Sequence, residues 1–334
     1  LKCKIRLQKI EMQEQIAQLN NVTHIPGTTL SFSVEPSIAQ VLENKVQESA
    51  DFLNSINSFG VTELKGEKLG MGVNGTVASR TDTKAKDRQT QDPTGLEGKG
   101  FELSKTNFDT HITHQKLDQW AKFPSFETFY RDNILHVIAR DRMTIGFNGT
   151  SRAANSDRSA NPLLQDVNIG WLEKIRQHNK GARHLASYEL GAPGNVQNTD
   201  ALVLDMIDSF LDPWHRSSTD LVVLGGRSII SDKYTTLVSA HAAPTERAAL
   251  QSLMSNRNLG SVPTIQVPFF PDNAIAVGLL SQLSIYWQEG SRRRTIVDNA
   301  KRDRIEDYQS VNEDYVIEDY GSWSFVENIS EFTS

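Results

Sequence analysis

Three glycines in the stretch LGMGVNGTVAS have the spacing that most directly suggests chemistry. Gly70, Gly72 and Gly75 follow G-x-G-x-x-G, and Val77 extends the match to G-x-G-x-x-G-x-V. Dinucleotide-binding turns and the glycine-rich loop of protein kinases share this spacing, because backbone N–H groups there hold phosphate. The spacing therefore suggests a nucleotide-binding enzyme as a first hypothesis.

The residues around the glycines do not meet the demands of either nucleotide site. A dinucleotide turn must open a helix, whereas the residues after Gly75 carry no 3.6-residue apolar period. A kinase needs a strand lysine and the triplets H-R-D and D-F-G, but Arg80 stands where the lysine belongs and neither triplet occurs. We keep a glycine-loop enzyme only as a distant alternative and expect no cofactor.

Two histidines are the other residues with metal-ligating spacing. His111 and His114 form H-x-x-H, which places both imidazoles on one face of a helix but on opposite faces of a strand. Their surroundings alternate as a strand does, so we expect no metal site. None of the eight histidines stands in the context of a Ser-His-Asp triad, and we expect that the protein is not an enzyme.

Composition narrows the function classes further. The chain has 334 residues, of which 38% are hydrophobic and 23% charged, enough to bury one or two cores. A formal net charge of -6 argues against broad nucleic-acid affinity, which requires a basic surface. The single cysteine, Cys3, excludes an internal disulfide framework and suits a reducing cytoplasm. The apolar runs are too short to span a bilayer, so we expect no membrane partner.

The N-terminal part shows two helical patterns. Residues 1–19 are mildly basic and amphipathic, and because the sequence begins with Leu1 we expect the encoded chain to start upstream. Pro36 opens a second pattern that Gly60 stops, and we expect one helix that packs on a partner surface. The positions on its packing face are Ile38, Val41, Leu42, Ser49, Phe52, Leu53 and Ile56.

The glycine stretch itself alternates as a strand does, with Leu69, Met71, Val73 and Val77 on one side. A second alternating run follows from Phe108 to His114 after a charged connection, so we expect a long two-stranded hairpin. Such a ribbon has too little apolar surface to be stable alone and should lie on another structure. Glycines in it mark places where a neighbouring backbone comes close, which explains them without a ligand.

The rest of the chain alternates helices and strands. A helix is predicted from Pro124 and Ser125 to about Ile145, followed by a polar loop and a short helix that buries Trp171. Thr199 is the predicted cap of a further helix, and helix-strand pairs recur to about residue 300. The final run alternates again and predicts a strand whose acidic pairs form a solvated face. These pairs are Glu306-Asp307, Glu313-Asp314 and Glu318-Asp319.

Five motifs in register carry a resemblance to a known family. They are SVEPSIAQVLENKVQESADFLNSIN, LKGEKLGMGVNGTVASRTDT, GFNGTSRAANSDRSANPLLQDVNIGWLEKIR, DLVVLGGRSIISDKY and DRIEDYQSVNEDYVIEDYG. Together they resemble the major capsid protein of peduoviruses, the contractile-tailed temperate phages. Each motif is weakly specific by itself, but the resemblance extends from about Phe32 to Ile329, nearly the whole chain.

The resemblance implies an α+β, HK-97-type phage capsid fold. Its parts would be an N-terminal arm (1–62), an extended loop (63–120), a peripheral domain (121–181 and 301–334) with a spine helix over 125–145, and an axial domain (182–300). The extended loop would lie over an adjacent subunit. The axial domains would meet at the centres of pentamers and hexamers.

The function implied is assembly of the icosahedral head that encloses double-stranded DNA, which an acidic wall would not bind tightly. The implied partners are other copies, a scaffold with its maturation protease, a portal and decoration proteins. Assembly is expected in the bacterial host cytoplasm and maturation cleavage near Phe32 and Ser33. A cellular nanocompartment shell is the alternative of the same fold.

Residues that contact neighbouring subunits are expected in the loop and in the two C-terminal charge groups, whose opposite charges pair across subunits in this interpretation. The loop candidates are Gly70, Gly72, Gly75, Arg80, Asp82, Lys84, Arg88, Lys99 and Glu102. The others are Arg292, Arg293, Arg294, Glu313, Asp314, Glu318 and Asp319.

Overall fold

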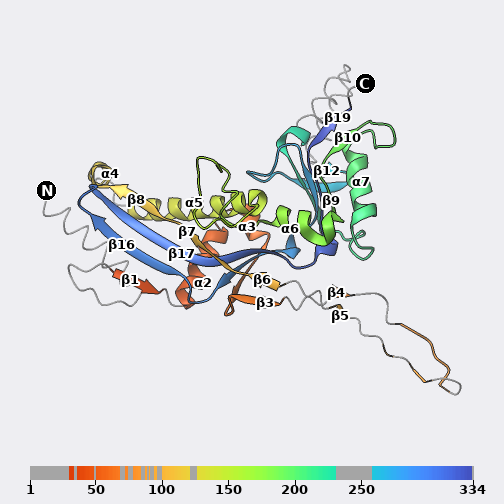
Figure 1. Cartoon of the computed structure of the whole chain (residues 1–334), viewed down its shortest axis with the longest axis horizontal. Coiled ribbons are helices and arrows are strands. Elements are labelled where there is room, and N and C mark those ends of the chain that lie inside the picture. Colours follow the sequence, from red (N-terminus) through yellow and green to blue (C-terminus); the bar gives the residue numbers. More distant parts are fainter. Residues whose placement is uncertain are drawn as a thin grey trace.

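The computed structural model describes most of the chain, from residue 30 to residue 332 with gaps. The described residues are 30–33, 36–48, 50–67, 72–73, 78–83, 87–88, 90, 94–95, 100–120, 126–230 and 258–332. Two sheets, a long helix and a projecting hairpin make up this part (Figure 1). None of its helices is long and apolar enough to cross a membrane.

A seven-stranded sheet organises one half of the molecule around its longest strand, β17 (Arg304–Ile317). Its path is β1-β16-β17-β15-β2, and β7 and β8 also pair with β17. The bounds are β1 (Leu30–Ser33), β2 (Asn57–Val61), β7 (Ser104–Asn107), β8 (Thr110–Thr113), β15 (Leu283–Gln288) and β16 (Arg293–Asn299). The sheet therefore brings together segments from the beginning, middle and end of the sequence.

The helix α5 (Phe126–Asn148) lies along this sheet as the predicted spine (Figure 1). Its apolar face, which includes Ile134 and Ile138, packs in one core cluster with Val311 of β17 and Ile285 of β15. The short helix α6 (Trp171–Gln177) follows, as predicted, and buries Trp171.

Trp171 explains why α5 carries a glycine at position 146. A Cβ at Gly146 would overlap the Trp171 indole, whose Nε1 donates to the backbone oxygen of Ser284 at 3.1 Å. The small residue lets the spine helix, α6 and the sheet meet at one point.

A six-stranded sheet forms the other half, in the order β12-β13-β11-β14-β18-β9. The helix α7 (Thr199–Phe210) packs Leu202 and Met206 into the core of this sheet. Asn198 caps it in place of the predicted Thr199, because the Asn198 side chain accepts from the Ala201 N–H. The strands are β9 (His184–Leu185), β11 (Leu221–Gly225), β12 (Asn258–Leu259), β13 (Val262–Ile265), β14 (Ile275–Leu279) and β18 (Ser324–Val326).

The remaining described elements are short. A parallel pair, β10 (Tyr188–Leu190) with β19 (Ile329–Glu331), lies beside the second sheet (Figure 1). Three 3-10 turns complete the described elements, η1 (His178–Gly181), η2 (Leu280–Gln282) and η3 (Tyr320–Ser322).

Strand pairing corrects the predicted composition of the two halves. Strands β15 and β16 lie inside the predicted range 182–300, yet both pair with β17 in the seven-stranded sheet. In the opposite direction β18, from the predicted range 301–334, joins the second sheet by pairing with β14. The chain crosses between the sheets at η2 and again at η3, because sheet membership follows pairing partners and not sequence order.

The predicted helix from Pro36 to Gly60 is also wrong. The segment forms α2 (Pro36–Glu48), α3 (Asp51–Asn54) and β2, and Gly60 lies within β2. Phe52 and Leu53 are buried in the main core, so this part belongs to the body and not to an arm. The parallel pairing of β2 with β15 outweighs the helical period of the sequence.

The extended hairpin exists, but its return side differs from the prediction. Strand β3 (Lys65–Glu67) pairs with β6 (Gly100–Glu102), and β4 (Gly72–Val73) pairs with β5 (Thr94–Gly95). The predicted return strand from Phe108 instead pairs with β17 as β8, and His114 begins the helix α4 (His114–Trp120). In Figure 1 the hairpin leads away from the seven-stranded sheet.

Candidate assembly site

The loop residues predicted to contact neighbours are exposed where the structure describes them. Arg80, Asp82 and Arg88 are all exposed, and the backbone of Gly72 pairs with Gly95 across the hairpin. The other loop candidates lie outside the described residues. They are Gly70, Gly75, Lys84 and Lys99.

Glu102 lies at the base of the hairpin, where β6 returns to the body. Its side chain is 54% exposed and pairs with Lys65 Nζ of β3 at 2.5 Å, which joins the two strands at their root. Arg152, in the loop after the spine helix, approaches the same carboxylate at 3.8 Å. The Lys65 hydrogen bond lowers the pKa of Glu102, so the carboxylate is charged at neutral pH.

Two of the three C-terminal acidic pairs are buried, which corrects the prediction of a solvated face. Glu306 and Asp307 are 7% exposed, Asp314 is 1% exposed and Glu313 is inaccessible. The reason is that β17 is an inner strand of the sheet, and side chains from the helices α5 and α6 reach its carboxylates. Side chains that the sequence pattern placed in solvent therefore face packed elements, and a buried carboxylate persists only when it is paired.

The structure gives each of these carboxylates a partner within its own chain. Asp307 accepts two hydrogen bonds from Arg294, at 2.6 and 2.9 Å, and Arg304 pairs with Glu306 at 2.6 Å. Asp314 binds Lys174 Nζ at 2.8 Å. These pairs hold the subunit together, and they remove Arg294, Glu313 and Asp314 from the exposed contact candidates.

The remaining C-terminal contact candidates differ in how far they are buried. Arg292 is buried, and Arg293 is exposed. Glu318 accepts from the Tyr286 hydroxyl at 3.1 Å, and Asp319 lies 2.8 Å from His215 Nε2. Both carboxylates are partly buried, so Arg293 is the freely exposed member of this group.

A charge cluster of four buried side chains ties α2 to the spine and to the sheet. It consists of Glu43, Arg142, Arg292 and Glu313. Arg142 of α5 pairs with Glu43 of α2 at 2.5 Å and with Glu313 of β17 at 2.9 Å, and Arg292 pairs with Glu43 at 2.7 Å. With two cations and two anions, the charges of the cluster balance.

The pKa values of the two carboxylates in the charge cluster are shifted in opposite directions. Burial would raise the pKa of Glu43, but Arg142 and Arg292 outweigh it and lower that pKa below 4.5. For Glu313 burial prevails over Arg142 and raises the pKa above 4.5. Glu43 is therefore the carboxylate whose charge the fold stabilises.

The sequence reading missed an aromatic surface at the end of the spine helix. Trp120 of α4 stacks on Phe126, which stacks on Tyr130, with ring centroids 5.8 and 5.9 Å apart. Trp120 is 49% exposed, and nearby in sequence Phe129 is 70% exposed. The aromatic-rich stretch WAKFPSFETFY was the available signal, but Phe126 and Tyr130 also fit the period of a buried helix face.

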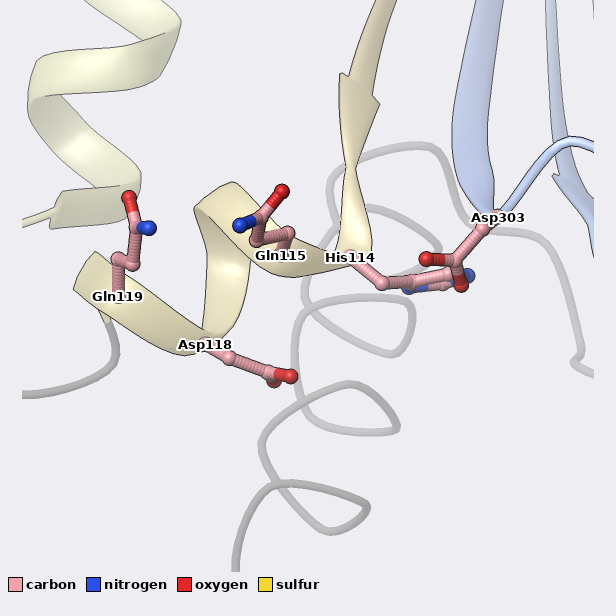
Figure 2. A pocket seen from close by; sticks show the side chains of 5 residues that line it. All are labelled: His114, Gln115, Asp118, Gln119 and Asp303. Carbon is pink, nitrogen blue, oxygen red and sulfur yellow. The ribbon is translucent and has the colours of Figure 1, made fainter.

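A polar depression of about 590 Å³ is lined by residues of α4 and by Asp303. Figure 2 shows His114 and Asp303 side by side, with Gln115, Asp118 and Gln119 on the helix. His114 Nε2 lies 3.0 Å from Asp298 Oδ1, and His111 is exposed on β8. Within the described ranges no group of three or more His, Cys, Asp or Glu side chains could hold a metal ion.

Comparisons with known proteins match nearly the whole chain. The family model for phage major capsid proteins of the P2 family matches residues 10–329. The capsid protein of Escherichia phage P2 is 39% identical over 327 residues, covering 94% of this chain and 91% of that protein. The major capsid protein of Serratia phage KSP20 is 36% identical over 328 residues, covering 94% and 93%.

A solved structure matches over a similar extent. It is the procapsid of satellite phage P4 with its size determination (Sid) protein, at 39% identity and a TM-score of 0.79. The match covers 90% of this chain and 94% of that chain.

Proposed function

Since the chain belongs to the P2 family of phage major capsid proteins and builds a phage capsid, we propose that its copies form pentamers and hexamers of an icosahedral head around double-stranded DNA. The observation that carries the proposal is the projecting hairpin of β3, β6, β4 and β5. A two-stranded ribbon is marginal by itself in water, and a neighbouring subunit would supply the surface it needs. Capsid proteins are a structural family and not an enzyme class.

The aromatic surface of Trp120, Phe126, Phe129 and Tyr130 serves as a second contact between copies. It lies at the far end of the spine helix from the second sheet (Figure 1). Exposed aromatic side chains that gather at one place mark interaction surfaces. Contacts at both ends of the subunit are what a closed shell requires, because each ring must also join its neighbouring rings.

Maturation cleavage near Phe32 and Ser33 would act on β1, at one end of the seven-stranded sheet. Phe32 pairs with Arg294 and Ser33 with Arg293 of β16. A protease needs an extended segment that it can reach, and an end strand is extended and has one side without a strand partner along the described path. The protease would come with the scaffold in the host cytoplasm, before portal-dependent DNA packaging and decoration.

Co-expression with the phage scaffold tests the proposed function. Uniform closed shells that form only with the scaffold, measured by light scattering and negative-stain microscopy, are the expected result. A persistent monomer with and without scaffold would overturn it. The family match to phage proteins disfavours the nanocompartment alternative, and native particles without DNA would revive it.

A further inference from the structure

The backbone of Glu102 is hydrogen-bonded to the body of the subunit, at the point where β6 reaches it. The Glu102 N–H donates to Asp314 Oδ2 at 3.2 Å, and its carbonyl oxygen accepts from Arg152 Nη2 at 2.8 Å. Arg152 Nη2 also donates to Asp314 Oδ1 at 3.0 Å. Asp314 and Arg152 thus bind each other and both backbone groups of one loop residue.

From this geometry we propose that Asp314 and Arg152 are positioning residues that set the direction in which the extended loop leaves the subunit. We call Asp314, Arg152, Lys174 and Asn168 the loop clamp. The proposal rests on the assembly function above, because direction matters only if the loop must reach a neighbouring subunit.

The loop clamp is densely hydrogen-bonded; Asp314 and Asn168 are buried, and Arg152 and Lys174 are partly buried. Lys174 Nζ donates to Asp314 Oδ1 at 2.8 Å, and Arg152 Nε donates to Asn168 Oδ1 at 2.8 Å. Asn168 is inaccessible and donates to the carbonyl oxygen of Glu313 at 2.9 Å. Asp314, Arg152 and Asn168 therefore each make at least two hydrogen bonds. Charge-assisted hydrogen bonds of this kind are the stronger ones.

The next residue secures the same point by apolar packing. Leu103 is 4% exposed, and its N–H donates to the Leu64 carbonyl oxygen at 2.9 Å. The Glu102 side chain, by contrast, is 54% exposed and reaches Lys65 on the hairpin itself. The hydrogen bonds of the clamp to Glu102 therefore go to its backbone, whereas its carboxylate lies 3.8 Å from Arg152 and pairs more closely with Lys65.

A small change of direction at the base has a large effect at the tip. An arm of about sixteen residues reaches at most about 55 Å, so a tilt of about 10° at the base moves its end by about 10 Å. A displacement of that size separates surfaces that must touch within about 4 Å. Loss of the clamp should therefore disturb shell geometry more than subunit folding.

The test compares Asp314→Asn with Asp307→Asn, a matched loss of a buried, arginine-bound carboxylate on the same strand but away from the hairpin. Each variant is co-expressed with the scaffold beside the wild type. For D314N we expect about tenfold faster deuterium exchange at the amides of Glu102 and Leu103, together with shells of mixed diameter. For D307N we expect uniform shells and unchanged exchange at those amides.

Uniform shells of wild-type diameter from D314N would overturn the proposal, as would equally mixed shells from D307N. If D314N does not fold, Arg152→Gln, in which Asp314 and Lys174 remain paired, takes its place with the same criteria. Failure of the wild type to form shells would instead refute the proposed function.

Discussion

Arg142 of the spine helix and Glu43 of α2, 99 positions apart in sequence, form an ion pair of 2.5 Å in which neither side chain is more than 2% exposed. The pair joins the segment that precedes the extended loop to the longest helix of the body. Because Glu313 and Arg292 complete the charge cluster, removal of one member leaves an unbalanced buried charge.

Glu43→Gln should therefore destabilise the isolated subunit by about 3–5 kcal/mol, the usual cost of breaking a buried ion pair from one side. Urea unfolding followed by circular dichroism measures this. Glu48→Gln, at an exposed position of the same helix, is the control and should change stability by less than about 0.5 kcal/mol. Equal costs for the two variants would show that the cluster does not stabilise the fold.

The change in folding stability at acid pH should follow the opposite pKa shifts of Glu43 and Glu313. Glu313, with a raised pKa, takes up its proton in the folded state first, so its titration does not reduce stability as pH falls toward 4.5. Glu43, with a lowered pKa, stays charged when the unfolded chain protonates, so its contribution is lost as pH falls below 4.5. Melting temperatures between pH 7 and 3 test this, and E43Q should flatten the loss below pH 4.5.

Gly146→Ala should lower subunit stability by roughly 2 kcal/mol or more, because the added methyl group meets the Trp171 indole in a packed core.

Gly72→Val, in the hairpin, should leave the melting temperature unchanged and impair shell assembly. Differential scanning fluorimetry and particle counts distinguish the two. Normal particles from Gly72→Val would refute close packing of the hairpin against a neighbour.

Phe129→Ser should leave the subunit as stable as the wild type, since this side chain is 70% exposed. Shell yield should fall, because the aromatic surface loses its most exposed ring. Leu163→Ser, 39% exposed on the loop after the spine helix, is the control and should assemble normally. Wild-type yield from Phe129→Ser would exclude this surface from the contacts between copies.

Periodicity predicted the elements whose burial follows one dominant face. The spine helix was expected over 125–145 and is observed over Phe126–Asn148, and the burial of Trp171 is confirmed. These are long or strongly amphipathic segments, for which local pattern and tertiary packing agree. The capsid family was identified from five motifs in register and is confirmed by the family match.

The errors arose where tertiary pairing overrides local pattern. Nothing local in Asn57–Val61 shows that it pairs with β15 more than two hundred positions later. The acidic pairs of β17 alternate as an exposed strand would, but the arginine partners of Glu313 and Asp314 come from distant segments, so the burial of this pair follows only from the completed fold. The loop clamp was missed for the same reason, because Asp314 and Glu102 meet only through the fold.

Cross-linking of isotope-mixed shells tests the central claim most directly. Subunits labelled with ¹⁴N and ¹⁵N are purified separately, mixed before scaffold-driven assembly, and treated with a lysine cross-linker. Mass spectrometry then identifies cross-links from the loop to lysines of the body such as Lys116. The loop lysines are Lys84, Lys86 and Lys99. If the extended loop lies over a neighbouring subunit, these links include mixed-isotope pairs; links confined to a single isotope would mean that the loop folds over its own subunit.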